Sequence, residues 1–175
     1  MKSFLTAMAC AAALFATSAT AQDVADMNDL EYAHIAYTAD NIDIRYAHLA
    51  LALSTNPAIH EFANTMIRDH TAVNEAALGL LDKLGASAQD NEFSQTLNTN
   101  ADKIIDGFVQ LRGAEFDAAY AENELAYHRA VNDLVENTMI PNIENDEVRA
   151  LFQQGLEIFK AHEGHAEMMA KALTE

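Results

Sequence analysis

The stretch that decides the fold runs from Ser54 to Gly85 and reads STNPAIHEFANTMIRDHTAVNEAALGLLDKLG. Its polar start offers Asn56 as a helix cap and Pro57 as a first helical residue, and Gly85 can end the helix. In between, residues on one stripe recur at three-to-four spacing, which is typical of an amphipathic helix. These residues are Ile59, Ala63, Met66, His70, Ala77 and Leu84. The short connection at Ser54 predicts that the helices on either side are antiparallel neighbours.

The same periodicity extends to the sequence on both sides of this helix. It predicts three more long helices, over residues 28–53, 114–137 and 146–173. On the last of these, Ile158 falls on the inward stripe. Residues 86–100 are polar and are interpreted as a loop, followed by a short helix over 101–111. The expected fold is therefore all-α, a ferritin-like four-helix bundle whose crossover segment carries a short extra helix.

The composition narrows the class of protein. The chain has 175 residues, with 27 Asp and Glu against 10 Lys and Arg, which gives a formal charge of −17. That charge excludes a nucleic-acid binder, which needs a basic surface. Because 50% of the residues are hydrophobic, a disordered acidic tail is excluded as well. The length fits one domain, and the low content of Pro and Gly favours helices.

The first residues have the features of an export signal. A positive start precedes a short apolar run, and Ala19 and Ala21 then have the spacing that signal peptidase accepts. We therefore expect residues 1–21 to be a cleaved signal peptide, residues 22–175 to be a single domain, and the protein to be periplasmic or secreted. The alternative is an N-terminal anchor helix, although the run is short for a membrane span. The only cysteine, Cys10, falls in this segment, so the mature chain has no thiol for disulfides or metals.

Polar residues on the apolar stripes point to a site inside the bundle. His70 and His162 lie in the middle of the stripes of the second and fourth long helices, and Glu124 and His128 lie four residues apart on the third. Asp43 lies about as many residues before the connection between the first two long helices as His70 lies after it. We therefore expect the two residues to lie at the same height along the bundle. Burying several ionisable groups in one layer is unfavourable unless they pair or bind a cation. The pattern predicts a transition-metal site at mid-bundle, suited to iron, zinc, manganese or copper.

The predicted site has two groups of residues. The candidate ligands are His70, His128, His162, Asp43, Glu124 and His165. The residues expected around them are Asp69, Asp117, Tyr120, Met66 and Met169. A thioether four residues from an imidazole, as in Met66 and His70, favours copper, whereas Met on an inward stripe is usual in a core. Glu31 and His34 have the Glu-x-x-His spacing of di-iron bundles. Such bundles need a second copy of this motif on a facing helix, and its absence from the sequence argues against a ferroxidase-type centre.

Three functions are compatible with this pattern. The first is a metal-binding protein for metal handling or oxidative-stress protection. The second is a non-enzymatic periplasmic interaction or stress protein, in which the same side chains form a structural hydrogen-bond network. The third is an oxidoreductase, which needs an open coordination position on its metal. The sequence indicates no protein partner, is compatible with a homo-oligomer, and has no second apolar stretch long enough to span a bilayer.

Two segments resemble a bacterial family of exported proteins. Residues 56–74, NPAIHEFANTMIRDHTAVN, and residues 113–128, GAEFDAAYAENELAYH, resemble its Met-x-x-Asp-His and Phe-Asp-x-x-Tyr signatures. The family is catalogued as domain of unknown function 4142, and the resemblance extends over residues 37–169. The resemblance implies an exported ferritin-like bundle with no settled activity. The sequence departs from the family pattern at Glu157, where the family usually has Pro. The positions that match the family are Asp69, His70, Asp117, Tyr120, His128 and His162.

Overall fold

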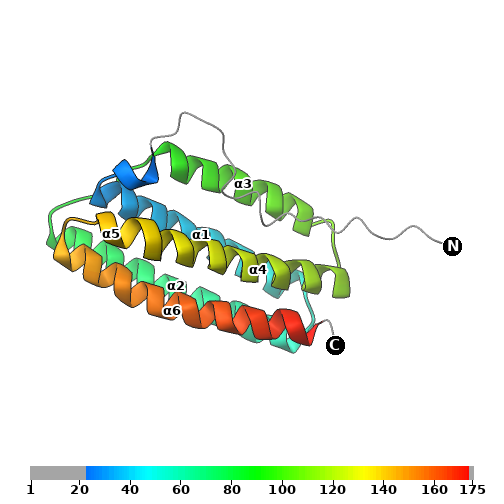
Figure 1. Cartoon of the computed structure of the whole chain (residues 1–175). Helices are drawn as coiled ribbons and strands as arrows, with labels where there is room; N and C mark the ends of the chain where they lie inside the picture. The colour runs from blue at the N-terminus through cyan, green and yellow to red at the C-terminus, as the bar shows by residue number, and fades with distance from the viewer. Residues whose placement is uncertain (1–22, 174–175) are drawn as a thin grey trace.

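A computed structural model describes residues 23–173, and Figure 1 shows them as a bundle of helices that lie side by side. The long helices are α1 (Asp29–Leu53), α2 (Pro57–Lys83), α3 (Glu92–Phe108), α4 (Ala114–Leu134) and α6 (Asp146–Ala172). The short elements are a 3-10 turn (Val24–Asp26), a π-helical turn (Val135–Met139) and α5 (Ile140–Asn142). No strand occurs within residues 23–173, which confirms the predicted all-α fold. The predicted signal peptide, residues 1–21, lies outside the described residues.

Asparagine side chains start most of the long helices. The side chains of Asn28, Asn56, Asn91 and Asn145 accept hydrogen bonds from backbone N–H groups in the first turns of α1, α2, α3 and α6. Such caps satisfy donors that have no partner inside a helix. α4 starts instead after Gly113, whose φ of 57° lies in the left-handed region that glycine adopts without strain.

The order of the helices gives the bundle its topology (Figure 1). Because residues 54–56 form a short connection, α1 and α2 pack as antiparallel neighbours. The chain then crosses along α3, which packs against α1, so that α4 runs in the same direction as α2. α6 returns antiparallel to α4 and also packs against α2. Four long helices with one long crossover are the arrangement that the sequence predicts.

The crossover segment differs from its prediction. The sequence predicts a loop over 86–100 and a short helix over 101–111, whereas α3 spans Glu92–Phe108. The helix begins early because an asparagine caps it and because its few apolar residues share one face. Its buried apolar residues are Leu97, Ala101 and Phe108. The expected loop is therefore wrong for the first half of α3.

Two other helices depart from the predicted pattern. α4 continues past its predicted end, through the π-helical turn and α5, to Asn142. On α6 the inward residue is Phe159, which is 7% exposed, rather than Ile158, which is 38% exposed. Phe159 is three residues from both Leu156 and His162, which are also buried, so the stripe follows that spacing.

The helices bury an apolar core along the bundle. Its largest fully buried side chains include Tyr32, Tyr46, Tyr120 and Phe116. The rings of Phe108 and Tyr127 each meet the ring of Tyr46 edge to face, with centroids 5.9 Å apart. Buried polar side chains interrupt this core near mid-bundle. Within residues 23–173, no helix combines the length and the apolar character that crossing a membrane requires.

Candidate metal centre

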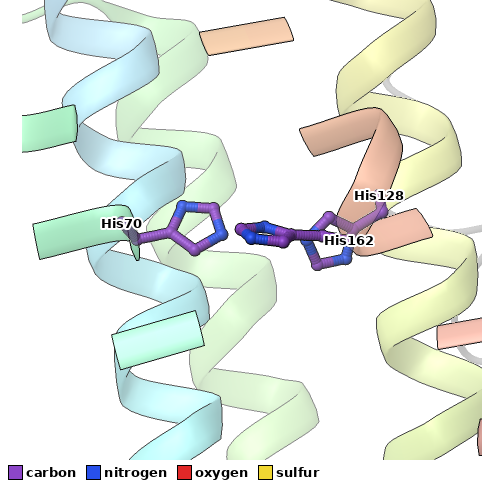
Figure 2. A group of neighbouring side chains, drawn as sticks. All are labelled: His70, His128 and His162. Carbon is purple, nitrogen blue, oxygen red and sulfur yellow. The ribbon is translucent and has the colours of Figure 1, made fainter. Parts of the chain in front are cut away.

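Three histidines on three helices point toward one another inside the bundle (Figure 2). His70 lies on α2, His128 on α4 and His162 on α6, and all three are buried. One ring nitrogen of each lies within 4.8 Å of the others. Ligand atoms of a tetrahedral ion are about 3.4 Å apart when each bond is about 2.1 Å. The three imidazoles would therefore have to move closer by at most about 1.4 Å to bind a single ion.

Each imidazole is held through one of its two ring nitrogens. The three contacts are His70 Nδ1 to Asp40 Oδ1 at 2.7 Å, His128 Nδ1 to the Glu124 carbonyl at 2.9 Å, and His162 Nε2 to Asp69 Oδ2 at 3.0 Å. Ionised carboxylates and carbonyls only accept hydrogen bonds, so the nitrogen in each contact carries the proton. The remaining nitrogens of His70, His128 and His162 are buried and make no hydrogen bond of normal geometry. Metal-binding histidines are usually oriented in this way.

Two buried carboxylates lie beside the histidines. Asp43 on α1 has an oxygen 2.6 Å from Nε2 of His70 and 3.8 Å from Nε2 of His128. Glu124 lies one turn before His128 on α4, and one atom each of Asp43, Glu124 and His128 lie within 4.8 Å of one another. Both carboxylates are fully buried. Asp43 pairs with His70, and Glu124 interacts with Asp43 and Asn123, although none of these contacts has the geometry of a regular hydrogen bond. Helices α1, α2, α4 and α6 thus each contribute to one layer, which we call the polar layer: Asp43, His70, Glu124, His128 and His162.

Burial and neighbouring charges set the protonation of the histidines. Burial lowers the pKa of His128, and it lowers the pKa of His162 to about 4, so both rings are neutral near pH 7. His70 differs because two aspartates flank it. Burial opposes its charge, but Asp43 and Asp40 together raise the pKa of His70 to about 10. His70 is therefore a cation between two carboxylates.

The carboxylates differ from one another in a similar way. Burial and the charge of Asp43 raise the pKa of Glu124 well above its usual range, which favours its neutral form. Burial also opposes ionisation of Asp43, but the charge of His70 outweighs it and holds the pKa of Asp43 below its usual range. A divalent cation in the polar layer would stabilise the ionised form of both carboxylates.

Aromatic rings enclose the polar layer. Phe159 of α6 stacks on the ring of His70, with centroids 4.9 Å apart and an angle of 9° between the planes. Phe62 of α2 meets His128 and Tyr120 edge to face, at centroid distances of 6.3 and 6.1 Å. Apolar walls of this kind keep water away, and electrostatic interactions are stronger in such a medium.

One contact connects the polar layer to the surface. Asp69, which accepts the hydrogen bond of His162, has a side chain that is 25% exposed. The guanidinium of Arg68 donates two hydrogen bonds to Asp69, at 2.7 and 3.0 Å. These bonds, with a smaller contribution from His162, lower the pKa of Asp69 despite its partial burial. The ionised Asp69 therefore lies between His162 and solvent.

The structure places most of the candidate ligands together. The residues that meet in the polar layer are His70, His128, His162, Asp43 and Glu124. The remaining candidate, His165, is exposed on α6 and is not among the residues that meet there. The reason is its position on α6, where the buried stripe continues from His162 to Ala166 instead.

The residues expected around the ligands are more widely distributed. Asp69 bonds to His162, and Tyr120 packs against Phe62 next to the layer. Asp117 instead accepts a hydrogen bond from the hydroxyl of Ser54 at 2.6 Å, at the connection between α1 and α2. The two remaining residues, Met66 and Met169, are buried in the apolar core.

Asp40 is a site residue that the sequence analysis missed. It is buried and bonds directly to His70. Its spacing could have revealed it, because Asp40 precedes Asp43 by three residues and therefore shares a face of α1 with it. The hydroxyl of Tyr46 was missed as well, since Tyr46 counts as apolar in a search for periodicity.

These groups are compatible with two kinds of chemistry. Imidazole nitrogens and carboxylate oxygens could together hold a transition-metal ion. The same side chains could instead form a hydrogen-bond network, in which the charged His70 joins Asp40 to Asp43. In either case the groups come from α1, α2, α4 and α6, so the layer depends on the assembled bundle.

Comparison with known proteins identifies the family. The family model described as Domain of unknown function (DUF4142) matches residues 14–169 of the chain. The match includes the whole polar layer and confirms the resemblance found in the sequence motifs. No curated protein and no solved structure matches the chain. The function is therefore inferred from the site rather than from a relative.

Proposed function

The chain belongs to the family described as a domain of unknown function (DUF4142), and we propose that it binds a transition-metal ion in the polar layer. The imidazoles of His70, His128 and His162 bind the ion through the nitrogens that their hydrogen bonds leave free. Asp43 supplies an oxygen from the fourth helix of the layer, α1. Three imidazoles and one carboxylate give four ligands, the number that transition metals such as zinc take in closed protein sites.

The observation that carries this proposal is the group of buried polar atoms that make no regular hydrogen bond. They are Oδ1 of Asp43, Oε1 and Oε2 of Glu124, Nε2 of His128 and Nδ1 of His162. Nε2 of His70 and Oδ2 of Asp43 are left out of this group, because they lie 2.6 Å apart and pair with each other. Each unsatisfied buried polar group costs about 1–3 kcal/mol of folding free energy, and charged groups cost more. Folded proteins contain few such atoms, and here they share one layer. A metal ion would serve several of them at once.

The donor set favours iron, zinc or copper. Neutral imidazoles suit all three metals, and carboxylate oxygens add manganese to the range. Thiolate ligands are excluded, because the only cysteine of the chain is Cys10, in the predicted signal peptide. The low pKa of His162 supports binding near neutral pH, since a histidine must be deprotonated to bind a metal. His70, whose pKa is about 10, would have to release a proton when the ion binds.

The enclosure of the polar layer favours metal handling over rapid catalysis. A four-coordinate site has no open position for a substrate, and aromatic rings separate the layer from water. We therefore propose a role in holding a metal ion, which would also protect against the oxidative stress that free metals cause. The apolar run before Ala19 and Ala21 supports export, and so a periplasmic or secreted location.

The metal content of protein purified without added metal tests this proposal. We expect a bound transition metal in the wild type and in His165→Gln, whose histidine is exposed on α6, but not in His162→Gln. Added Zn(II) should raise the Tm of the wild type and of the control, and should leave the Tm of His162→Gln unchanged. A wild type that contains no transition metal, and that none stabilises, would contradict the proposal.

A second candidate function rests on the contacts of His70. Its two ring nitrogens lie 2.7 Å from Asp40 and 2.6 Å from Asp43, so the imidazolium is matched by carboxylates on both sides. That contact favours a structural network in a non-enzymatic interaction or stress protein. Under this alternative, His70→Gln lowers the free energy of unfolding while transition metals leave the Tm of the wild type unchanged.

A further inference from the structure

The buried tyrosines of the bundle differ in how their hydroxyls are satisfied. Tyr32 and Tyr127 donate hydrogen bonds to backbone carbonyls, at 2.8 and 2.9 Å. The hydroxyls of Tyr46 and Tyr120 are also buried, but they have no hydrogen-bond partner. Buried phenols usually find an acceptor, because their hydroxyl loses water on folding. The unpaired hydroxyls of Tyr46 and Tyr120 therefore indicate a missing partner.

Both unpaired tyrosines lie beside the carboxylates of the polar layer. Tyr120 precedes Glu124 by four residues on α4, and Tyr46 follows Asp43 by three residues on α1. Each tyrosine thus shares a helix face with one carboxylate. Burial and the charges of Glu124 and Asp43 raise the pKa of both phenols, as expected for hydroxyls near these two carboxylates.

The carboxylates belong to a second candidate metal-binding group, which shares His128 with the three-histidine group. Asp43, Glu124 and His128 make up this second group. His128 has a single free nitrogen, because its Nδ1 donates to a backbone carbonyl, so it can bind one ion only. Asp43 has two oxygens, and a carboxylate can bridge two metal ions about 3.5–4 Å apart. Asp43 can therefore bind the ion at the three histidines with Oδ2 and a second ion with Oδ1.

We propose that Asp43, Glu124 and the hydroxyls of Tyr46 and Tyr120 form a second cation position, joined by Asp43 to the three-histidine position. The inference rests on the proposed function and adds a second ion to the same centre. Along α4, the residues Tyr120, Glu124 and His128 follow at intervals of one turn, so the second position lies on the side of the first that faces the start of α4. Its lining is oxygen alone, which suits a hard divalent ion such as Mn(II).

A sequential titration tests for two different positions. The wild-type chain is stripped of metal, loaded with an equal amount of Zn(II) and then titrated with Mn(II), whose free form is followed by electron paramagnetic resonance. We expect the zinc-loaded wild type to bind Mn(II) and Glu124→Gln, which loses a ligand of the second position, to bind no Mn(II). Tyr46→Phe and Tyr120→Phe should each weaken Mn(II) binding about 10- to 100-fold, the range for groups that support a metal site. Tyr127→Phe is the matched control, because its hydroxyl already has a backbone acceptor, and should bind Mn(II) as the wild type does.

The outcomes separate this inference from the proposed function. Zinc binding without Mn(II) binding in the wild type would overturn the second position and leave the three-histidine position intact. Equal Mn(II) binding by the wild type, Tyr46→Phe and Tyr120→Phe would likewise remove the tyrosines from the site. Failure of the wild type to bind either ion would overturn both proposals. Zinc binding by each variant also shows that its polar layer is still assembled.

Discussion

In each imidazole, the group that accepts a hydrogen bond from one ring nitrogen determines which nitrogen is left to face the polar layer. Asp40, the backbone of Glu124 and Asp69 each take the N–H of one histidine. The second nitrogen then faces the polar layer. In His128 and His162 it has a free lone pair, whereas in His70 it carries the proton that pairs with Asp43. If the layer binds an ion, Asp40 and Asp69 would therefore influence its affinity without touching it, and Asp40 is the more deeply buried of the two.

Replacing Asp40 tests this control. In Asp40→Asn the side chain keeps its shape but loses the charge that orients His70, so we expect metal affinity to fall about 10- to 100-fold. Asp90→Asn is the control, because Asp90 lies beside a histidine at the surface, 3.7 Å from His34. Competition with a chelator of known affinity measures the change. Equal affinities in Asp40→Asn and the control would show that Asp40 does not orient a ligand.

The neutral state of His162 gives the metal-stripped protein a pH dependence. Burial lowers the pKa of His162 to about 4 in the folded protein, whereas an unfolded chain has a histidine pKa of about 6.5. As the pH falls between these values, the unfolded chain binds a proton that the folded protein does not, so the free energy of unfolding decreases. We expect a smaller decrease in His162→Gln, measured by urea unfolding at several pH values. The same decrease in both proteins would mean that His162 is not held neutral.

The helices explain how much of the site the sequence can predict. The short connection before Pro57 fixes the phase of α1 against α2, so counting residues from it places Asp43 level with His70. The contact of 2.6 Å between them is consistent with that count. The same reasoning wrongly places Ile158 on the inward face. Neighbouring residues point about 100° apart around the helix axis, and a stripe chosen one residue away from the true one still has regular helical spacing. Asp40 escaped notice because charged residues are normally assigned to the solvent face.

The crossover helix α3 packs on the core, although its mostly polar sequence does not indicate this. Its polar residues outnumber the apolar ones, so only tertiary contacts with α1 show that α3 belongs to the core. Leu97 is buried, and Leu97→Ala should lower the free energy of unfolding by about 2–5 kcal/mol. Asn98→Ala, at the exposed neighbouring position, should change it by less than about 0.5 kcal/mol. Chemical denaturation measures both, and equal effects would mean that α3 is not packed as described.

At the scale of the whole molecule, the polar layer joins the four long helices other than α3. Each of these helices contributes at least one side chain, so the site exists only when the bundle is assembled. The four-helix arrangement follows from periodicity and connection lengths, and it brings the candidate ligands of different helices to one level. Metal binding does not follow from the sequence in the same way, because the same imidazoles and carboxylates can also form hydrogen bonds with one another.

Metal binding should therefore stabilise the whole bundle. A ligand that binds only the folded state, at a concentration 100 times its Kd, adds about 2.7 kcal/mol to the free energy of unfolding. We expect calorimetry to show a higher Tm with Zn(II), reversed by a chelator, in the wild type and in His60→Gln, whose ring bonds to the Ser54 carbonyl away from the layer. A Tm that does not depend on zinc concentration would mean that the layer holds no ion.

Anomalous diffraction from crystals grown with zinc tests directly whether the polar layer binds a metal ion. We expect a strong anomalous peak inside the bundle, about 2.0–2.1 Å from imidazole nitrogens. Those nitrogens belong to His70, His128 and His162, with an oxygen of Asp43 as the next ligand. Peaks confined to surface carboxylates, with these three imidazoles bonded only to protein groups, would contradict it.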